Sequence, residues 1–342
     1  MRSVLNSSVS LRERTSRLRF GFTIIELMVV IVIIAILIGI LVPAISKVRQ
    51  TARDAEARKD ISDLEQAIAQ FKVSFGIEPP SRITLYAQPG DWDSMTYAPD
   101  NKRDKGIVRQ IWPKFDFATC GGASNGTTFY GTAMTTPINL NGAECLVFFL
   151  GGLIDPASGA FVGFGKDPAR PFALSSAPAS GAIPPAGYLY ITNREGPFFE
   201  FKGARNTTTG QFTGRLTDVN NNLVPEYRDP LPQQTQPYLY FSAASGNYRT
   251  APTTTGMPIS MSNPWINTDC GGLMNYAYYS KFNNAATPTA SLPYKPKSFQ
   301  IISPGPDARY GTGGFFDPNN NANLSADDRD NITNFHPGRL GN

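Results

Sequence analysis

The stretch that decides the fold is FTIIELMVVIVIIAILIGILV, which runs from Phe22 to Val42. As a helix, this stretch would be about 31 Å long, which matches a hydrocarbon core about 30 Å thick. A cleaved secretory signal has a shorter apolar run with a small-residue cleavage site after it, and neither feature is present here. The sequence therefore predicts a transmembrane helix over residues 22–42.

Basic residues flank the span on both sides. Five Arg precede it, and Lys47, Arg49 and Arg53 follow it within fifteen positions. This imbalance favours a cytoplasmic N-terminus, so we expect the bulk of the chain outside the cytoplasm.

The composition excludes several function classes. The chain has 342 residues and a formal net charge of +4, but five Arg and one Glu lie in the first 21 residues. The remainder holds 26 basic and 26 acidic side chains, so clustered positive charge for DNA or RNA binding is not indicated. The single histidine, His336, excludes multi-histidine metal sites and disfavours most familiar hydrolase mechanisms.

One carboxylate, Glu26, interrupts the apolar run. A charge near the bilayer centre costs about 2.5 to 3.5 kcal/mol on insertion scales, so this side chain either snorkels to water or needs a partner. The segment GFTIIEL, residues 21–27, follows an Arg-rich leader and opens the apolar helix. It closely resembles the processing motif of type IV prepilins and type II secretion pseudopilins.

The resemblance implies a role for four residues. In this family a prepilin peptidase cuts after the glycine, here Gly21, and N-methylates the new first residue, here Phe22. Glu26 would then pair with the N-terminal amine of a neighbouring subunit, and Pro43 matches the family's helix-kinking proline. Residues 1–21 would be a leader peptide that is removed.

The resemblance also implies location and partners. We expect a single-pass inner-membrane protein with a cytoplasmic N-terminus and a periplasmic globular domain. Its partners would be the prepilin peptidase, further copies of itself in a filament, other pseudopilins, the inner-membrane secretion platform and the membrane. No nucleic-acid partner is expected.

An amphipathic stem is predicted over residues 43–76. Apolar residues recur at steps of three and four, so one continuous helix should run from about Phe22 to Ser74. A coiled coil is disfavoured because the heptad-like run lasts only about two heptads, and a sheet is needed to cover the stripe. Asp54 and Arg58 stand at i, i+4, a pair worth only a few tenths of a kcal/mol. The stripe comprises Val48, Ile61, Leu64, Ile68, Phe71 and Phe75.

The rest of the chain is rich in turn residues. From Ile77 onward there are 27 Pro in 266 residues, which predicts short strands joined by irregular loops. Asn141 is expected to cap a short apolar helix that reaches Leu150. Strands are expected over residues 188–192, 238–242, 276–280 and 298–303.

Two segments in this region also carry the resemblance. Asp229-Pro230 and the later Pro237-Tyr238-Leu239-Tyr240 look like the first-strand motif of major pseudopilins, although Leu231 replaces its Trp. Residues 299–335 resemble the family's strand, glycine loop and acidic C-terminal turn. In that family the acidic turn binds calcium.

A Ca²⁺ cofactor is therefore expected at the acidic turn, where carboxylates offer the hard oxygen ligands that Ca²⁺ prefers. A solvated Asn/Asp-rich loop is the alternative. The run from Asp218 to Asn222 echoes the start of an EF-hand loop, but Leu223 stands where the sharp turn needs Gly. The expected calcium ligands are Asp307, Asp317, Asp327, Asp328 and Asp330.

Three cysteines allow one disulfide in an oxidising compartment. Cys145 lies in the apolar helix and is interpreted as a buried thiol, which leaves a Cys120–Cys270 bridge. Four aromatic residues in the region before the sheet either pack turns or form a partner surface. They are Trp92, Trp112, Phe129 and Tyr130.

These features predict an α+β, pilin-like fold. A long N-terminal transmembrane and stem helix packs on a small antiparallel sheet at residues 229–342, which also carry the acidic loop, and residues 77–228 form a loop-rich insertion with a short helix and strands. We expect a non-enzymatic subunit of a type II secretion pseudopilus that assembles through its N-terminal helix to drive protein export. The alternatives are a type IV pilin or minor pilus subunit and, in another class, a membrane-tethered periplasmic binding domain or enzyme.

Overall fold

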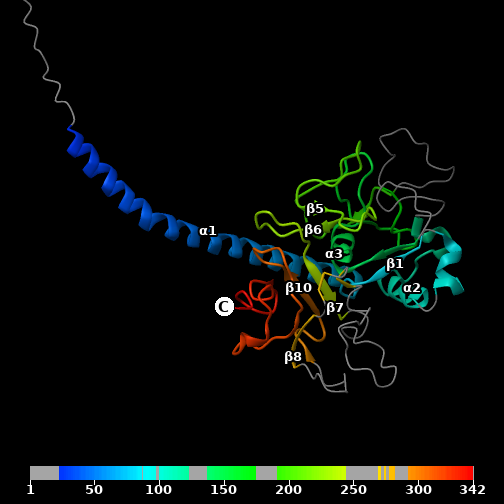
Figure 1. Ribbon diagram of the computed structural model, residues 1–342. Coiled ribbons are helices and arrows are strands. Elements are labelled where there is room, and N and C mark those ends of the chain that lie inside the picture. The colour runs from blue at the N-terminus through cyan, green and yellow to red at the C-terminus, as the bar shows by residue number, and fades with distance from the viewer. Residues whose placement is uncertain are drawn as a thin grey trace, which may run out of the picture. The chain divides into compact units, whose positions relative to one another are not determined.

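The computed structural model divides into two units, and one long helix runs from the first into the second (Figure 1). The first unit ends at Thr51 and the second begins at Ala52. The structure describes residues 23–86, 88–97, 100–122, 137–174, 191–243, 269–270, 273–274, 277–281 and 292–341.

Helix α1 runs from Ile24 to Phe75, as the sequence predicts, and Pro43 lies inside it. Every described residue up to Arg53 is exposed in the isolated chain. The apolar part of α1 is long and apolar enough to cross a membrane by length and composition. The described part of the first unit is thus one helix with exposed side chains.

The second part of α1 lies in the core of the domain. Ile61, Leu64, Ile68 and Phe71 are at most 3% exposed, and Phe75 is partly buried against the same core, which confirms these positions of the predicted apolar stripe. The inclusion of Val48 in the stripe is wrong, because Val48 is 69% exposed. The helix ends at Gly76, whose φ of +81° suits glycine and whose amide donates to the Lys72 carbonyl.

Helix α3 (Gly142–Gly151) is entirely buried, which explains its uninterrupted apolar sequence. Asn141 caps it as predicted, and the side chain of Glu144 returns a bond to the Asn141 amide in a capping box. A Cβ on Gly142 would lie 1.9 Å from the Tyr240 carbonyl oxygen. Glycine therefore permits this close approach of α3 to strand β7.

Two three-stranded sheets form the C-terminal part of the domain. In the first, β10 (Phe299–Ser303) pairs antiparallel with both β7 (Leu239–Ser242) and β12 (Ile332–Thr333). In the second, β8 (Tyr278–Lys281) pairs antiparallel with β9 (Leu292–Pro293) and parallel with β11 (Gly314–Phe315). The strands predicted near residues 238–242, 276–280 and 298–303 are confirmed in kind and close to their predicted bounds.

Smaller pairs of strands lie in the region before β7, all antiparallel. The strand expected at residues 188–192 is wrong at residues 191 and 192, which are not in a strand, and residues 188–190 lie outside the described part. The pairs are β1 (Ile83–Leu85) with β2 (Ile138–Leu140), β3 (Phe164–Gly165) with β4 (Arg194–Glu195), and β5 (Leu216–Thr217) with β6 (Glu226–Tyr227).

Helix α2 (Asp100–Ile111) was not expected from the sequence. Its composition is dominated by charged and polar residues, which hides the apolar positions. The signal that could have revealed it is the helical spacing of Asp104, Ile107, Val108 and Ile111, all of which are buried. Four 3-10 segments complete the described structure: Pro89–Asp93, Met95–Tyr97, Phe117–Gly122 and Asn321–Asn323.

Aromatic side chains fill the core between α1 and the region before the sheet. The Trp112 ring lies 5.1 Å from that of Phe164 and 5.6 Å from that of Phe75. Trp92 and Trp112 are both buried, so they pack turns and do not form a partner surface, whereas Phe129 and Tyr130 lie outside the described residues. The α+β, pilin-like fold is confirmed, with one face of α1 in the same buried cluster as residues of β7 and β10.

Candidate functional site

The predicted cleavage site, Gly21 and Phe22, lies outside the described residues. The described part of the chain begins at Thr23, which caps α1 together with Glu26. The Glu26 Oε2 atom accepts bonds from the Thr23 amide at 2.8 Å and from its hydroxyl at 2.7 Å, and the Glu26 amide donates to Thr23 Oγ1 at 3.2 Å. This reciprocal arrangement fixes the first turn and holds the carboxylate at the N-terminal end of the apolar helix.

The surface around Glu26 is strongly apolar. Ile24 is 79% exposed and Ile40 is 69% exposed, and aliphatic side chains continue between them on all sides of the helix. Such a continuous apolar surface has to be buried by lipid or by other helices.

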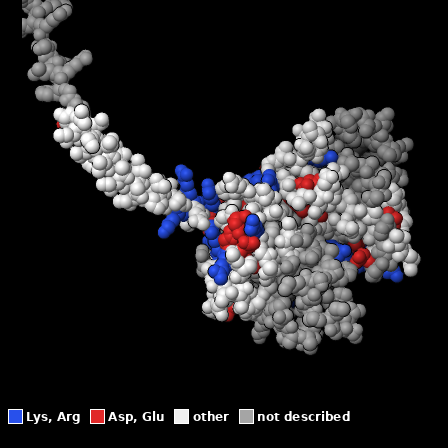
Figure 2. Space-filling view, in the orientation of Figure 1, with Lys and Arg blue, Asp and Glu red and all other residues white. Residues whose placement is uncertain are grey.

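A basic segment follows the apolar span. Pro43 removes one amide from the helix, and the Ser46 hydroxyl donates to the Pro43 carbonyl at 2.9 Å. Lys47, Arg49 and Arg53 are exposed, and Figure 2 shows basic atoms on both sides of the helix beyond its apolar stretch.

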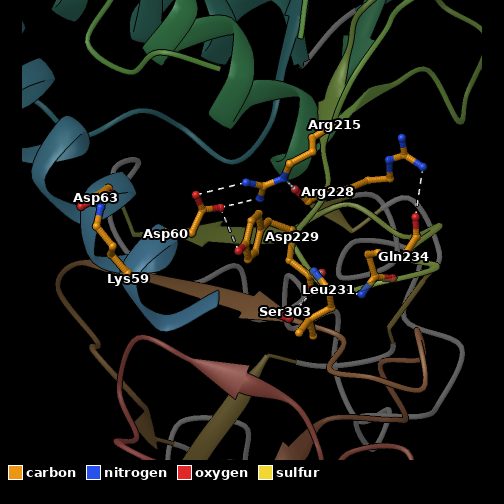
Figure 3. A network of polar contacts seen from close by, with 10 residues as sticks. Lys59, Asp60, Asp63, Arg215, Arg228, Asp229, Leu231, Gln234 and Ser303 are labelled. Atoms are coloured by element: carbon orange, nitrogen blue, oxygen red, sulfur yellow. Dashed lines mark hydrogen bonds and ion pairs between the residues drawn. The ribbon is translucent and has the colours of Figure 1, made fainter. Parts of the chain in front are cut away.

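A buried ion pair ties α1 to strand segments of the domain (Figure 3). The Arg215 guanidinium contacts the Asp60 carboxylate through two N–O pairs, at 2.5 and 3.3 Å. The Tyr238 hydroxyl donates to Asp60 Oδ2 at 3.0 Å, and the guanidinium also stacks 4.2 Å from the centre of the Tyr227 ring. We call Asp60, Arg215 and Tyr238 the stem clasp.

Asp54 forms a second buried pair. Its oxygens accept from Arg339 Nε at 2.9 Å and from Arg339 Nη2 at 2.8 Å. The expected Asp54–Arg58 pair along the helix is therefore wrong, because Asp54 faces the domain and meets an arginine near the C-terminus.

Both halves of the divided first-strand motif have structural roles. Asp229 accepts bonds from the Leu231 amide at 2.9 Å, the Gln234 side chain at 3.0 Å and the Ser303 hydroxyl (Figure 3). Burial raises the pKa of Asp229 even though these bonds favour its charged form. Tyr240 donates to the Pro79 carbonyl at 2.7 Å, so the motif positions the start of β7 against β10 and the end of the stem.

The structure does not bring the five predicted calcium ligands together. Among the described residues there is no group of three or more His, Cys, Asp or Glu side chains that could hold a metal ion. Asp328 is fully buried and bonded to protein donors, and Asp317 accepts the Asn319 amide in its own turn at 2.9 Å. Asp307 and Asp330 lie close together, since Asp330 Oδ2 accepts the Asp307 amide at 3.1 Å. Burial is the main cause that raises the pKa of Asp307, and the nearby Asp327 carboxylate raises it further.

The predicted Cys120–Cys270 disulfide is not formed in the structure. Cys120, Cys145 and Cys270 are all buried and are not bonded to one another, and Cys120 and Cys270 belong to different hydrophobic clusters. The Gly-Gly sequence that follows both cysteines suggested two similar loops, but the two cysteines pack in different clusters. Cys145 lies buried in α3, as expected.

The second oxygen-rich run lies over the N-terminus of α3. Asn220 and Asn222 each donate to Glu144 Oε1 at 2.8 Å, and Asn141 donates to Glu226 at 3.2 Å. Glu144 and Glu226 are each 1% exposed. Burial raises the pKa of both carboxyls, that of Glu226 to about 7.

No catalytic constellation was identified in the described part of the chain. His336 Nδ1 accepts a hydrogen bond from the Gly338 amide at 3.2 Å, and its ring packs edge-on against Phe316. These contacts stabilise the C-terminal turn. A polar cavity of about 340 Å³ includes Arg82, Asp100 and Asn139 in its wall but no cysteine or histidine.

Two comparisons with known proteins give matches. Residues 16–42 match the family model of the prokaryotic N-terminal methylation motif. The chain is also 33% identical over 97 residues to the type II secretion system core protein G of Aeromonas hydrophila. That alignment covers 28% of this chain and 66% of the relative, just under two thirds of its length. No solved structure matches the chain.

The apolar helix, the match to the methylation motif and the α+β domain together support a type IV pilin-like protein. Within that class the chain is pseudopilin-like, with similarity to the core protein G of a type II secretion system. Among the described residues, one helix is long and apolar enough to anchor the chain in a membrane, and proteins of the pilin-like class are typically structural.

The stem clasp predicts that Arg215→Met destabilises the domain. The substitution leaves the Asp60 carboxylate buried without its cation, which should lower the free energy of unfolding by about 3 to 5 kcal/mol. Urea unfolding of the detergent-solubilised protein, followed by fluorescence of the buried Trp92 and Trp112, measures the loss. The control is Lys59→Met, which breaks the exposed Lys59–Asp63 pair on the same helix and should leave stability nearly unchanged. Equal effects of the two substitutions would contradict a clasp role.

The raised pKa of Glu226 predicts a specific pH dependence of the domain's stability. Its pKa is about 7 in the folded state and near 4.5 when unfolded, so the folded state holds the proton more tightly. Its contribution to stability is fully present below pH 4.5 and is lost as the pH rises through 7. Between pH 5 and pH 8 this loss should be about 2 kcal/mol, and Glu226→Gln should remove it. Urea unfolding at both pH values tests this, with the exposed Glu200→Gln as control; an unchanged pH dependence in Glu226→Gln would refute the assignment.

Proposed function

We propose that this protein is a structural subunit of a type II secretion pseudopilus, which assembles through α1 and supports protein export. The observation that carries the proposal is the exposed apolar part of α1 with its single carboxylate at the N-terminal end. The match to the N-terminal methylation motif and the similarity to core protein G support it.

In this proposal a prepilin peptidase cuts after Gly21 and methylates the amine of Phe22. The mature chain then starts one residue before Thr23, where the described helix cap begins. The amine and the Glu26 carboxylate both enter the apolar part of the assembly, where each charge alone is unfavourable. Pairing the amine of one subunit with Glu26 of a neighbour neutralises the two charges together.

Such a pair determines the axial register of neighbouring subunits more than it strengthens their association. A buried ion pair need not be more stable than an apolar substitute, but one unpaired charge costs several kcal/mol. Wrong axial positions of neighbouring helices would leave both charges unpaired and are therefore disfavoured. Oε2 of Glu26 already accepts two bonds from Thr23, which holds the carboxylate in place for the partner.

The proposed location is the inner membrane, with the N-terminus in the cytoplasm and the domain from Ala52 onward in the periplasm. The basic residues on both sides of the span support this orientation only modestly, because three of them follow it. The proposed partners are further copies of the chain, other pseudopilins, the peptidase and the inner-membrane secretion platform.

A type IV pilin or minor pilus subunit is the alternative within the same class. It differs from the proposal in the phenotype of a deletion: loss of long surface fibres favours the pilin, and loss of exoprotein secretion favours the pseudopilin.

We predict that Glu26→Gln and Glu26→Val leave insertion and cleavage intact but impair ordered assembly. Cysteines introduced one at a time on the exposed face of α1 report the register through cross-linking between subunits. The three native cysteines are buried and should not interfere. The wild type should give one repeated pattern of cross-linked positions, and the variants should give a weaker and broader pattern.

The matched control is Glu56→Gln, which removes an exposed carboxylate from the same helix beyond the apolar span. It should keep the wild-type pattern. Wild-type filament yield and register in Glu26→Val would show that the carboxylate is dispensable, and a failure of that variant to insert would show a role in insertion instead.

A further inference from the structure

One carboxylate of the C-terminal turn has an unusual environment. Asp328 is 0% exposed, and its two oxygens accept six hydrogen bonds. The shortest come from the Ser325 hydroxyl at 2.6 Å, the Tyr278 hydroxyl at 2.7 Å and the Gly313 amide at 2.9 Å. The Thr312 amide, its hydroxyl and the Ser325 amide complete the set at 3.2 to 3.4 Å.

The donors come from three separate segments. Tyr278 belongs to strand β8, Thr312 and Gly313 to the glycine loop, and Ser325 to the turn that carries Asp328 itself. Asn331 extends the network, since its side-chain Nδ2 donates to the Tyr278 hydroxyl at 2.8 Å and to the Tyr310 carbonyl at 2.9 Å. One buried charge therefore connects strand, loop and turn.

The packing around Asp328 leaves no space for an ion on the side of the glycine loop. Gly311 has a φ of +65°, and a Cβ there would lie 2.5 Å from Asp328 Cγ and 2.5 Å from the Ser325 hydroxyl. A carboxylate has about four acceptor sites, so six donors leave none for a metal. Calcium binding at Asp328 would require several of these bonds to break.

We infer that the C-terminal turn is closed by hydrogen bonds to Asp328 where the acidic turn of pseudopilins holds calcium, so that this turn folds without a divalent cation. The physical basis is that N–H and O–H donors of the protein stabilise the buried Asp328 carboxylate, as a bound cation would otherwise do. The inference concerns the domain alone and does not depend on the proposed function.

Asp330, two residues after Asp328, has an oxygen atom in a different environment. Asp330 Oδ1 is buried with no hydrogen-bond partner among the described residues. Burial raises the pKa of Asp330 to about 6, and the Asp307 carboxylate adds to this. A cation, if one bound in this turn, would contact Asp330 rather than Asp328.

The experiment is thermal unfolding of the detergent-solubilised full chain, with excess calcium and with a chelator. The wild type should have the same midpoint in both. Asp328→Asn should lower the midpoint by about 5 °C or more in both, because its amide cannot accept the same donors. Tyr278→Phe removes only one hydroxyl and should cause a smaller fall, so the network can be tested even if Asp328→Asn does not fold.

Asp317→Asn is the matched control, because that carboxylate accepts a bond only within its own exposed turn. It should leave the midpoint unchanged in both conditions. A wild-type midpoint that falls with the chelator would overturn the inference, and loss of that response in Asp330→Asn would place the cation at Asp330. An unchanged midpoint in both Asp328→Asn and Tyr278→Phe would also overturn it.

Discussion

The stem clasp is the interaction on which the domain depends, because it lets a helix that begins as an apolar anchor become part of a folded core. The second part of α1 buries Leu64 and Phe71, but it also carries Asp60 into the same environment. An unpaired carboxylate at that depth would offset much of the gain from apolar burial. Arg215 and Tyr238 satisfy it, and the Asp54–Arg339 pair repeats the arrangement nearly two helical turns earlier. The charges thus specify which face of α1 meets the domain.

Much of the fold could be predicted because it is encoded locally. The anchor is visible as an unbroken apolar run, the stem as a stripe at helical spacing, and α3 from the cap at Asn141. Helix α2 was missed because charged residues surround its few apolar positions, so its burial depends on the tertiary fold. Strands β7 and β10 could be predicted from their β-branched and aromatic residues. The parallel pairing of β11 with β8 depends on the tertiary fold and could not be predicted from local sequence.

The candidate sites were less predictable, because their partners are far apart in the sequence. Asp54 and Arg339 are 285 positions apart, and no periodicity relates them. The sequence presented Asp328 as one of five similar acids, yet Tyr278 lies 50 positions before it and converts it into a buried acceptor. A disulfide between Cys120 and Cys270 was expected from count and context, but thiol pairing requires proximity that composition does not report. Only the N-terminal motif could be identified directly, since its residues are contiguous.

The central claim is that α1 is the processed anchor and assembly helix of a pilin-like subunit, and the mass of the membrane-extracted protein tests it most directly. Intact mass spectrometry on cells with an active prepilin peptidase should find a chain that begins at Phe22 and carries one added methyl group. A chain that still contains residues 1–21 in those cells would contradict the account.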